Sequence, residues 1–227
     1  MTDAPLLTVT RLSAKRGARQ VLDEVSFTAR SREILGVIGP NGAGKTTLFE
    51  CVAGLLPVSG GEIRATADTA LFYMPDAIRP WPDQTVRWNL DLTQRIFASR
   101  VDAGLVTALD LDRLLDAKSG TLSKGEAKRL DLAIALSVPR PLLLLDEPFD
   151  GLDLRQTRKV MDLLRGCVSA GRTLVLSIHQ LTDAARVCDR FLLLDNGRSV
   201  AEGTLAELLA RTAAPDGSLE EVFLALT

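Results

Sequence analysis

The chain has 227 residues, with 27 lysines and arginines against 29 aspartates and glutamates and one neutral histidine, which gives a formal net charge of −2. This near balance offers no electrostatic basis for binding nucleic acid. Hydrophobic residues make up 46% and charged residues 25%, as in an ordinary folded domain, which argues against a disordered, collagen-like or fibrous chain. No apolar run approaches the roughly 18 residues that a membrane-spanning helix needs. We therefore expect one compact α/β domain that does not itself cross a bilayer.

The first elements in chain order are strands. Residues 6–11 and 21–29 are predicted strands that pair as an antiparallel edge. The apolar run 33–38 is typical of a buried strand, and it leads through a glycine-rich turn into residues 45–55, which have helical composition. The order strand, loop, helix is the local context that a phosphate-binding loop requires.

The middle of the chain changes in character. A segment with prolines and tryptophans opens residues 77–140, and helical patterns follow over 85–98 and 101–115. We interpret this region as a helical subdomain inserted into the α/β core. Three apolar runs separated by helical stretches then predict that a parallel sheet, covered by helices on both faces, resumes. These runs are 141–145, 173–178 and 190–194, with a last short strand at 199–201 and a final helix at 218–226.

The turn after the buried strand matches the pattern G-x-x-x-x-G-K-[ST]. It reads Gly39-Pro40-Asn41-Gly42-Ala43-Gly44-Lys45-Thr46. Glycines allow backbone N–H groups to turn inward around an anion, and the helix N-terminus adds partial positive charge. We expect Lys45 to reach the β- and γ-phosphates of ATP, Thr46 to offer its hydroxyl to Mg²⁺, and Thr47 to complete the nucleotide contacts. The alternative, a plain glycine-rich turn, is disfavoured by the strand and helix on either side.

Two carboxylates follow the predicted strand 141–145. Asp146 and Glu147 would lie at the carboxyl edge of the sheet, where ligands bind in open α/β folds. Asp146 is a candidate for the Mg²⁺ shell, and Glu147 for orienting or deprotonating the attacking water. The alternative is that both acids only cap a loop, and the phosphate-binding pattern upstream favours the catalytic interpretation.

A third motif, at residues 122–126, resembles the signature of a known family. The run 122–126, Leu-Ser-Lys-Gly-Glu, resembles the LSGGQ signature of nucleotide-binding subunits of ATP-binding-cassette (ABC) transporters, with Lys124 and Glu126 in place of Gly and Gln. The resemblance implies that Ser123 and Gly125 contact the γ-phosphate of ATP held by a second subunit. A simpler interpretation is a helix N-cap in which Ser123 and Glu126 form a capping box. The two interpretations are compatible.

Further positions extend the resemblance to essentially the whole chain. The run 148–153, ending in Asp153, resembles the loop that links the two active sites of the family. His179, the only histidine, stands after a predicted strand at the family's switch position, where the resemblance implies a hydrogen bond to the γ-phosphate. The sequence that follows His179 resembles the exporter branch.

The sequence departs from the family pattern at two nucleotide contacts. Arg16 stands near the position of the usual aromatic residue that stacks on adenine; it would either stack its guanidinium group on the base or remain solvated. Asp76 replaces the Gln of the family's Gln loop, and as a carboxylate it is a candidate ligand of Mg²⁺.

Both tryptophans of the chain fall beside this Gln-loop position. In the family a short helix of the transmembrane subunit docks here, so Trp81 and Trp88 are candidates for a binding hot spot. The alternative is that both are buried within the helical subdomain.

The resemblance implies an α/β fold with a P-loop NTPase core, a mixed sheet, an antiparallel β edge and the helical insertion at about 77–140, all in a single ABC ATPase domain over residues 1–227. It implies an ATPase that uses ATP and Mg²⁺ to drive transport, in the direction of export, through transmembrane permease subunits on separate chains. A second nucleotide-binding subunit completes the dimer, for which two copies of this chain suffice, and no nucleic acid is involved.

The N-terminus lacks the pattern of a signal peptide, so we expect a cytoplasmic protein, peripheral on the cytoplasmic face of the membrane. The alternative function is that of a soluble ABC ATPase in iron–sulfur cofactor assembly, because the run 125–129, Gly-Glu-Ala-Lys-Arg, is also found in signatures of that class.

Overall fold

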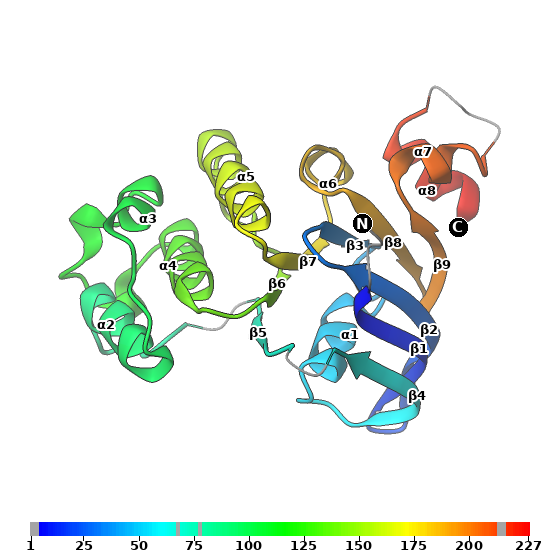
Figure 1. Ribbon diagram of the computed structural model, residues 1–227, viewed down its shortest axis with the longest axis horizontal. Coiled ribbons are helices and arrows are strands. Elements are labelled where there is room, and N and C mark those ends of the chain that lie inside the picture. The colour runs from blue at the N-terminus through cyan, green and yellow to red at the C-terminus, as the bar shows by residue number, and fades with distance from the viewer. Residues whose placement is uncertain (1–4, 67–68, 77–78, 213–216) are drawn as a thin grey trace.

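The computed structural model describes residues 5–66, 69–76, 79–212 and 217–227 (Figure 1). A six-stranded sheet with the order β5-β6-β7-β3-β8-β9 forms its centre. The strands are β3 (Ile34–Ile38), β5 (Leu71–Met74), β6 (Leu142–Asp146), β7 (Thr173–Ile178), β8 (Arg190–Asp195) and β9 (Arg198–Gly203). Only β9 pairs antiparallel, with β8, so the sheet is mixed, as predicted.

Strand alternation divides the apolar side chains of this sheet between two cores. Every residue of β3, β6 and β7 is buried. In β6, Leu142 and Leu144 enter one core, and Leu143 and Leu145 enter the other, because successive side chains of a strand point to opposite faces. The central strands are therefore held rigidly, and the loops at their ends are fixed in place.

One face of the sheet is covered by a helix and a second sheet. The helix is α1 (Lys45–Val52), which ends before Gly54 with its φ of +73° and is shorter than predicted. The second sheet has the order β2-β1-β4, with β1 (Pro5–Arg16), β2 (Arg19–Arg30) and β4 (Val58–Ala65). The antiparallel pairing of β1 with β2 confirms the predicted pair, but it belongs to this separate sheet. A helix therefore covers this face, as predicted, together with a second sheet that the prediction did not include.

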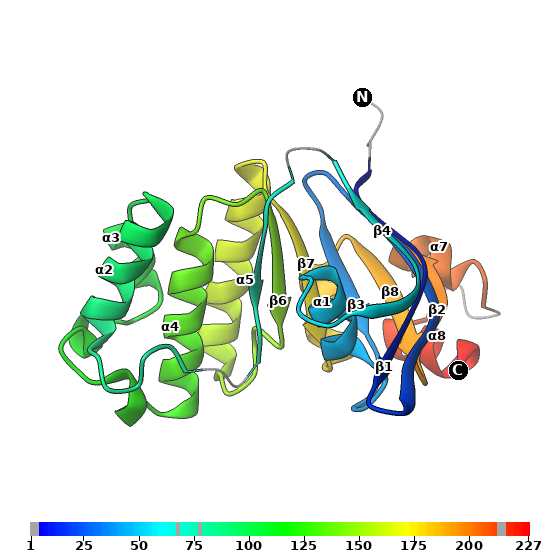
Figure 2. The same ribbon diagram turned by 90° about the horizontal axis from the view of Figure 1, so that it is seen from below.

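Helices cover the other face. They include α5 (Leu154–Ser169), α6 (Leu181–Val187) and the C-terminal α8 (Leu219–Leu226), with the short α7 (Leu205–Leu209) beside β9. Figure 1 shows this helical layer and the antiparallel sheet on opposite sides of the central strands, and Figure 2, seen from below, shows α1 and the antiparallel sheet in front of them.

A helical end of the molecule extends from the parallel edge of the sheet. It is built of α2 (Val86–Phe97), α3 (Ala103–Ala108) and α4 (Lys124–Ser137), with 3₁₀ turns at Asp112–Leu114 and Ser119–Thr121 (Figure 1). The prediction of one helix over 101–115 was wrong, since α3 ends at Ala108 and Asp110 adopts a left-handed φ of +53°. Among the described residues, no helix is long and apolar enough to cross a bilayer.

Candidate functional site

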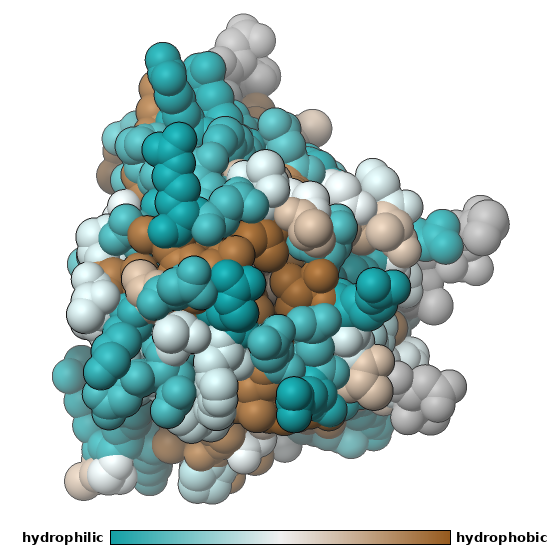
Figure 3. Space-filling model, turned by 90° about the vertical axis from the view of Figure 1, so that its left-hand side faces the viewer, coloured by the Kyte–Doolittle hydropathy of each residue, from teal (hydrophilic) through white to brown (hydrophobic). Residues whose placement is uncertain are grey.

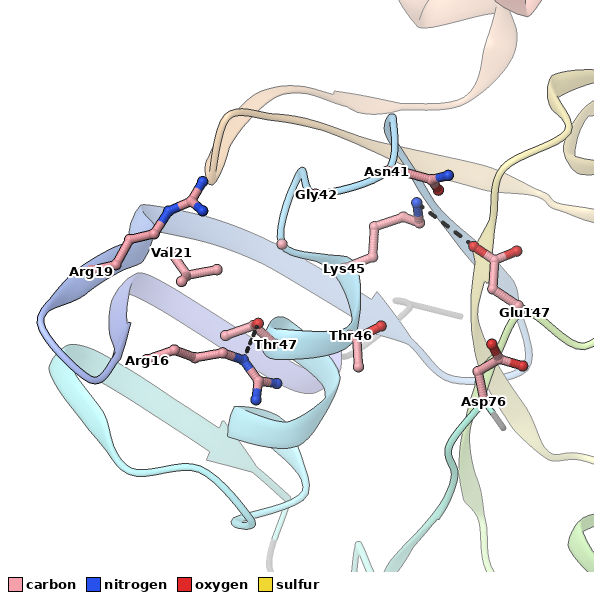
Figure 4. A pocket seen from close by; sticks show the side chains of 11 residues that line it. Arg16, Arg19, Val21, Asn41, Gly42, Lys45, Thr46, Thr47, Asp76 and Glu147 are labelled. Atoms are coloured by element: carbon pink, nitrogen blue, oxygen red, sulfur yellow. Dashed lines mark hydrogen bonds and ion pairs between the residues drawn. The ribbon is translucent and has the colours of Figure 1, made fainter. Parts of the chain in front are cut away.

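A cavity of about 390 Å³ opens at the carboxyl edge of the parallel strands, beside the loop between β3 and α1 (Figure 4). Because β3, β5, β6 and β7 run parallel, the residues that follow them meet at this edge. The lining residues are Arg16, Arg19, Val21, Asn41, Gly42, Gly44, Lys45, Thr46, Thr47, Asp76 and Glu147. All of these except Arg19 and Val21 were predicted from the sequence.

The loop 39–46 has the backbone shape of an anion cradle. Gly42 and Gly44 have φ of +85° and +107°, values that residues with a side chain rarely adopt. A Cβ on Gly39 would lie 2.2 Å from the carbonyl oxygen of Leu194, so this position admits only glycine. Gly44 is the N-cap of α1 and provides no side-chain cap, which leaves the first N–H groups of the helix to an anion.

Lys45 lies across this loop. Its side chain is 7% exposed, and its Nζ donates to the carbonyl oxygen of Gly39 at 2.7 Å. The same Nζ is 3.7 Å from Oε1 of Glu147. A buried cation beside free helix N–H groups makes this an anion-binding point of the cavity.

Asp146 is held by three side chains. It is 1% exposed, and its Oδ2 accepts hydrogen bonds from Thr46 Oγ1 at 2.8 Å and from the Tyr73 hydroxyl at 3.4 Å. Its Oδ1 accepts from the Ser177 hydroxyl. Burial and the neighbouring Asp146 raise the pKa of Tyr73, so Tyr73 remains a hydrogen-bond donor. Tyr73 and Ser177 were not predicted from the sequence, although a serine in a wholly buried strand is a signal of a polar partner.

Glu147 stands between two basic groups. Its φ of +48° turns the chain sharply after β6, and its backbone N–H donates to Ser177 Oγ at 2.9 Å. Oε2 lies 2.8 Å from His179 Nδ1, while Oε1 faces Lys45. Because Glu147 is 17% exposed and His179 is 45% exposed, the carboxylate is shielded but reachable from solvent. The arrangement suits a base that receives a proton from water.

Arg16 and Asp76 mark opposite ends of the cavity (Figure 4). Arg16 Nε donates to Thr47 Oγ1 at 3.1 Å, and its NH2 group pairs with Glu50, so its guanidinium group is anchored rather than free in solvent. Asp76 follows β5, and its Oδ1 accepts from Lys128 Nζ at 2.7 Å. Both residues lie where the sequence predicted nucleotide or metal contacts, and those roles stay predictions.

The signature run lies outside this cavity. Ser123 is the N-cap of α4 and forms the expected capping box, with its backbone N–H donating to Glu126 at 2.8 Å. A Cβ on Gly125 would lie 2.6 Å from the carbonyl oxygen of Gly151, so the run packs on the loop before α5. Asp153 in that loop is the N-cap of α5. The structure therefore does not bring Ser123, Gly125 or Asp153 to the nucleotide cavity of their own chain.

The two tryptophans form an exposed pair. Trp81 is 55% exposed and Trp88 is 38% exposed, and their rings meet edge to face with centroids 5.8 Å apart. The alternative that both are buried was wrong. Figure 3 looks onto this helical end of the molecule, where apolar surface is visible between polar side chains.

Comparisons with known proteins agree with this geometry. A family model described as "ABC transporter" matches residues 22–150. The Nod factor export ATP-binding protein I of Ralstonia nicotianae is 31% identical in an alignment of 221 positions that covers 90% of this chain and 69% of that protein. The protein of the same name from Rhizobium etli is 33% identical over 214 residues, covering 87% of this chain and 68% of the relative.

Solved structures match over nearly the whole chain. One described as the ATP-binding subunit of an ABC transporter has a TM-score of 0.90 and 29% identity, covering 97% of this chain and 99% of that one. A dimeric ATP-binding cassette bound to ADP and Pi has a TM-score of 0.78 over 88% of this chain and 98% of that one, and at 21% identity it indicates the fold alone.

Proposed function

The chain belongs to the ABC transporter family, and from that premise we propose that it is the ATP-hydrolysing subunit of an exporter, acting on transmembrane subunits carried by separate chains. The observation that carries the proposal is the position of Glu147, held between Lys45 and His179 at the rim of a phosphate-binding loop. Export as the direction is supported by the names of the relatives.

Binding of the triphosphate is assigned to the loop 39–46. Its backbone N–H groups and the N-terminus of α1 would surround the β-phosphate, and Lys45 would release the carbonyl oxygen of Gly39 to contact the β- and γ-phosphates. The nucleoside would extend toward Arg16, Arg19 and Val21, the part of the lining farthest from Glu147 (Figure 4).

The oxygen donors near this loop fit Mg²⁺. Thr46 Oγ1 and Asp146 Oδ2 are already 2.8 Å apart, and a hydroxyl with a carboxylate is the donor set that this ion takes beside phosphate oxygens and water. Among the described residues, no group of three His, Cys, Asp or Glu side chains could hold a metal alone, so the ion would arrive with the nucleotide. When bound, Mg²⁺ would neutralise charge on the β- and γ-phosphates.

Hydrolysis is assigned to Glu147 and His179. Glu147 would orient the attacking water and accept its proton. His179 would hold the Glu147 carboxylate through Nδ1 and present its other ring nitrogen to the γ-phosphate. Lys45 would stabilise negative charge as it develops on the transferred phosphoryl group.

Assembly with further chains completes the proposal. Ser123 and Asp153 are exposed and Gly125 is partly exposed, so they would be available to a second nucleotide-binding subunit, for which a second copy of this chain suffices. The Trp81–Trp88 pair would contact the membrane partner on the cytoplasmic face, because exposed paired aromatics are typical anchors of interfaces. Residues 77–140 would act as the helical subdomain of the single ABC ATPase domain.

The test is co-purification with a trapped subunit. Glu147→Gln should bind ATP yet hydrolyse it at least about 100-fold more slowly than the native protein, because the amide cannot accept a proton. Tagged Glu147→Gln, expressed in its own host and purified from detergent-solubilised membranes, should recover a polytopic membrane protein. Lys45→Ala, which loses the phosphate contact, is the matched control.

Recovery only from the soluble fraction, with cytosolic assembly proteins, would contradict the transport proposal. It would favour the iron–sulfur assembly alternative, for which the export-named relatives give no support.

A further inference from the structure

Two lysines of the described part of the chain are buried, and only one of them belongs to the phosphate-binding loop. The other is Lys128, on α4, with 4% of its side chain exposed. Its Nζ donates to Asp76 Oδ1 at 2.7 Å. An ammonium group at this depth needs an anionic partner, because burial penalises an unpaired charge. The ion pair is therefore a fixed feature of the fold and not a mobile surface contact.

Asp76 connects this ion pair to the nucleotide cavity. It lines the cavity together with Lys45, Thr46 and Glu147, and Figure 4 shows its carboxylate group beside Glu147. Because Asp76 is 37% exposed, the carboxylate that Lys128 binds on one side remains open to the cavity on the other. The orientation of Asp76 toward a bound triphosphate thus depends on Lys128.

The same contact joins two parts of the chain. Asp76 follows β5 at the edge of the central sheet, whereas Lys128 lies on the helix capped by Ser123. A displacement of Asp76 would therefore displace α4, the helix that begins with the signature run. A displacement of α4 would likewise move Asp76.

The surroundings of Lys128 favour Asp76 over the other nearby carboxylate. Asp131 lies three residues further along α4, but burial raises its pKa to about 7, so near neutral pH it is partly protonated and a weaker anion. The charged groups that act on Asp131 are Lys128, Asp76 and Arg79. Among the ion pairs of the described residues, Asp76 is the partner of Lys128.

We infer that Lys128 is a positioning residue for ATP hydrolysis, which holds the Asp76 carboxylate at the rim of the nucleotide cavity and couples that rim to α4. Lys128 does not itself line the nucleotide cavity, so it would act through Asp76. The inference rests on the ATPase function proposed above.

A double-mutant cycle tests it. Lys128→Met removes the ammonium group but keeps an unbranched apolar stem, and Asp76→Asn removes the charge of its partner without a change of shape. The combined variant leaves no unpaired buried charge, so it should fold. Steady-state ATP hydrolysis by the full chain gives kcat and KM for each of the four proteins. Lys159→Met is the control, since Lys159 pairs with Asp110 at 2.9 Å where both side chains are about half exposed.

We expect Lys128→Met to lower kcat about tenfold with less than a twofold change in KM, and to change kcat less than twofold when Asp76 is already Asn. Lys159→Met should leave both constants within twofold. If Lys128→Met alone cannot be purified, Lys128→Arg is measured instead, once with native Asp76 and once with Asp76→Asn. The criterion is the same: the change in kcat should be much smaller in the Asp76→Asn protein.

Equal effects of the Lys128 substitution in both backgrounds would overturn the inference, because a merely structural lysine lowers activity whatever residue 76 is. Absence of ATP hydrolysis by the native chain would instead contradict the proposed function, so the two failures are distinguishable.

Discussion

Ser177 is the residue on which both carboxylates of the hydrolytic site depend. Its hydroxyl donates to the buried Asp146, and its oxygen accepts the backbone N–H of Glu147 at 2.9 Å. A hydrogen bond to a charged group contributes about 1.5–3 kcal/mol and a neutral one about 0.5–1.5 kcal/mol. Ser177→Ala should therefore cost about 2–4 kcal/mol, shared between the free energy of unfolding and the positioning of the two acids.

The loss of positioning appears in the rate of ATP hydrolysis. If about 1.4–2.7 kcal/mol of the total is felt in the transition state, kcat/KM falls roughly 10- to 100-fold, since each 1.36 kcal/mol corresponds to a factor of ten. The assay is steady-state phosphate release at saturating Mg²⁺, with a urea titration of the same samples to measure the free energy of unfolding.

A control in the same strand separates stability from catalysis. Val175 is fully buried two residues before Ser177, and Val175→Ala removes apolar contacts without touching either acid. It should destabilise the protein by about 1–3 kcal/mol while kcat/KM stays within about twofold. The reasoning would be refuted if Ser177→Ala kept native kcat/KM, or if both variants lost activity in proportion to their loss of stability.

Two further predictions concern the helical end of the molecule. Trp81→Ala and Trp88→Ala should each weaken the capture of a membrane partner by a tagged subunit, because the pair is exposed. Basal ATP hydrolysis should stay unchanged, because the pair lies outside the nucleotide cavity. Equal capture by native and variant proteins would contradict this prediction. Asp131 has its pKa raised to about 7 by burial, so the folded protein binds a proton that the unfolded chain releases above about pH 4. Its contribution to stability is therefore greatest below pH 4 and is lost as the pH rises toward 7, by between roughly 1 and 4 kcal/mol. Urea titrations from pH 5 to 8 should show this decline in the native protein and a flatter profile in Asp131→Asn, and identical profiles would show that Asp131 is not the titrating group.

The parts of the fold that could be predicted are those encoded locally. The strand 173–178 agrees with β7 at both ends, because a mostly apolar run with β-branched residues is bounded by polar residues. Glycines and a following helix mark the loop 39–46 in the sequence, so its place in the cavity could also be predicted. In contrast, β4 contains Gly60-Gly61 and mostly exposed side chains, which leaves neither alternation nor an apolar run to detect.

The residues that escaped prediction depend on which strands are neighbours. Ser177 reaches Asp146 because β6 and β7 pair with these two residues in register, and the sequence does not specify that pairing. Tyr73 likewise reaches Asp146 only because β5 is the next strand on the other side. The contact of Lys128 with Asp76 spans 52 positions and joins a helix to a loop, so no periodicity in the sequence indicates it.

The capping box at the start of α4 bears on how this chain would meet a second copy. Ser123 donates its hydroxyl hydrogen to Glu126 Oε2 at 2.7 Å, so that hydrogen is already engaged in the single chain. The serine and backbone hydrogen bonds keep the pKa of Glu126 below its usual range, so it is an anion at neutral pH. A phosphate that approached Ser123 would meet this negative charge, and Ser123 would have to exchange one anion for another. In the proposed dimer, closure on ATP would therefore require Glu126 to turn away from Ser123, a rearrangement that a neutral glutamine at the same position would make easier.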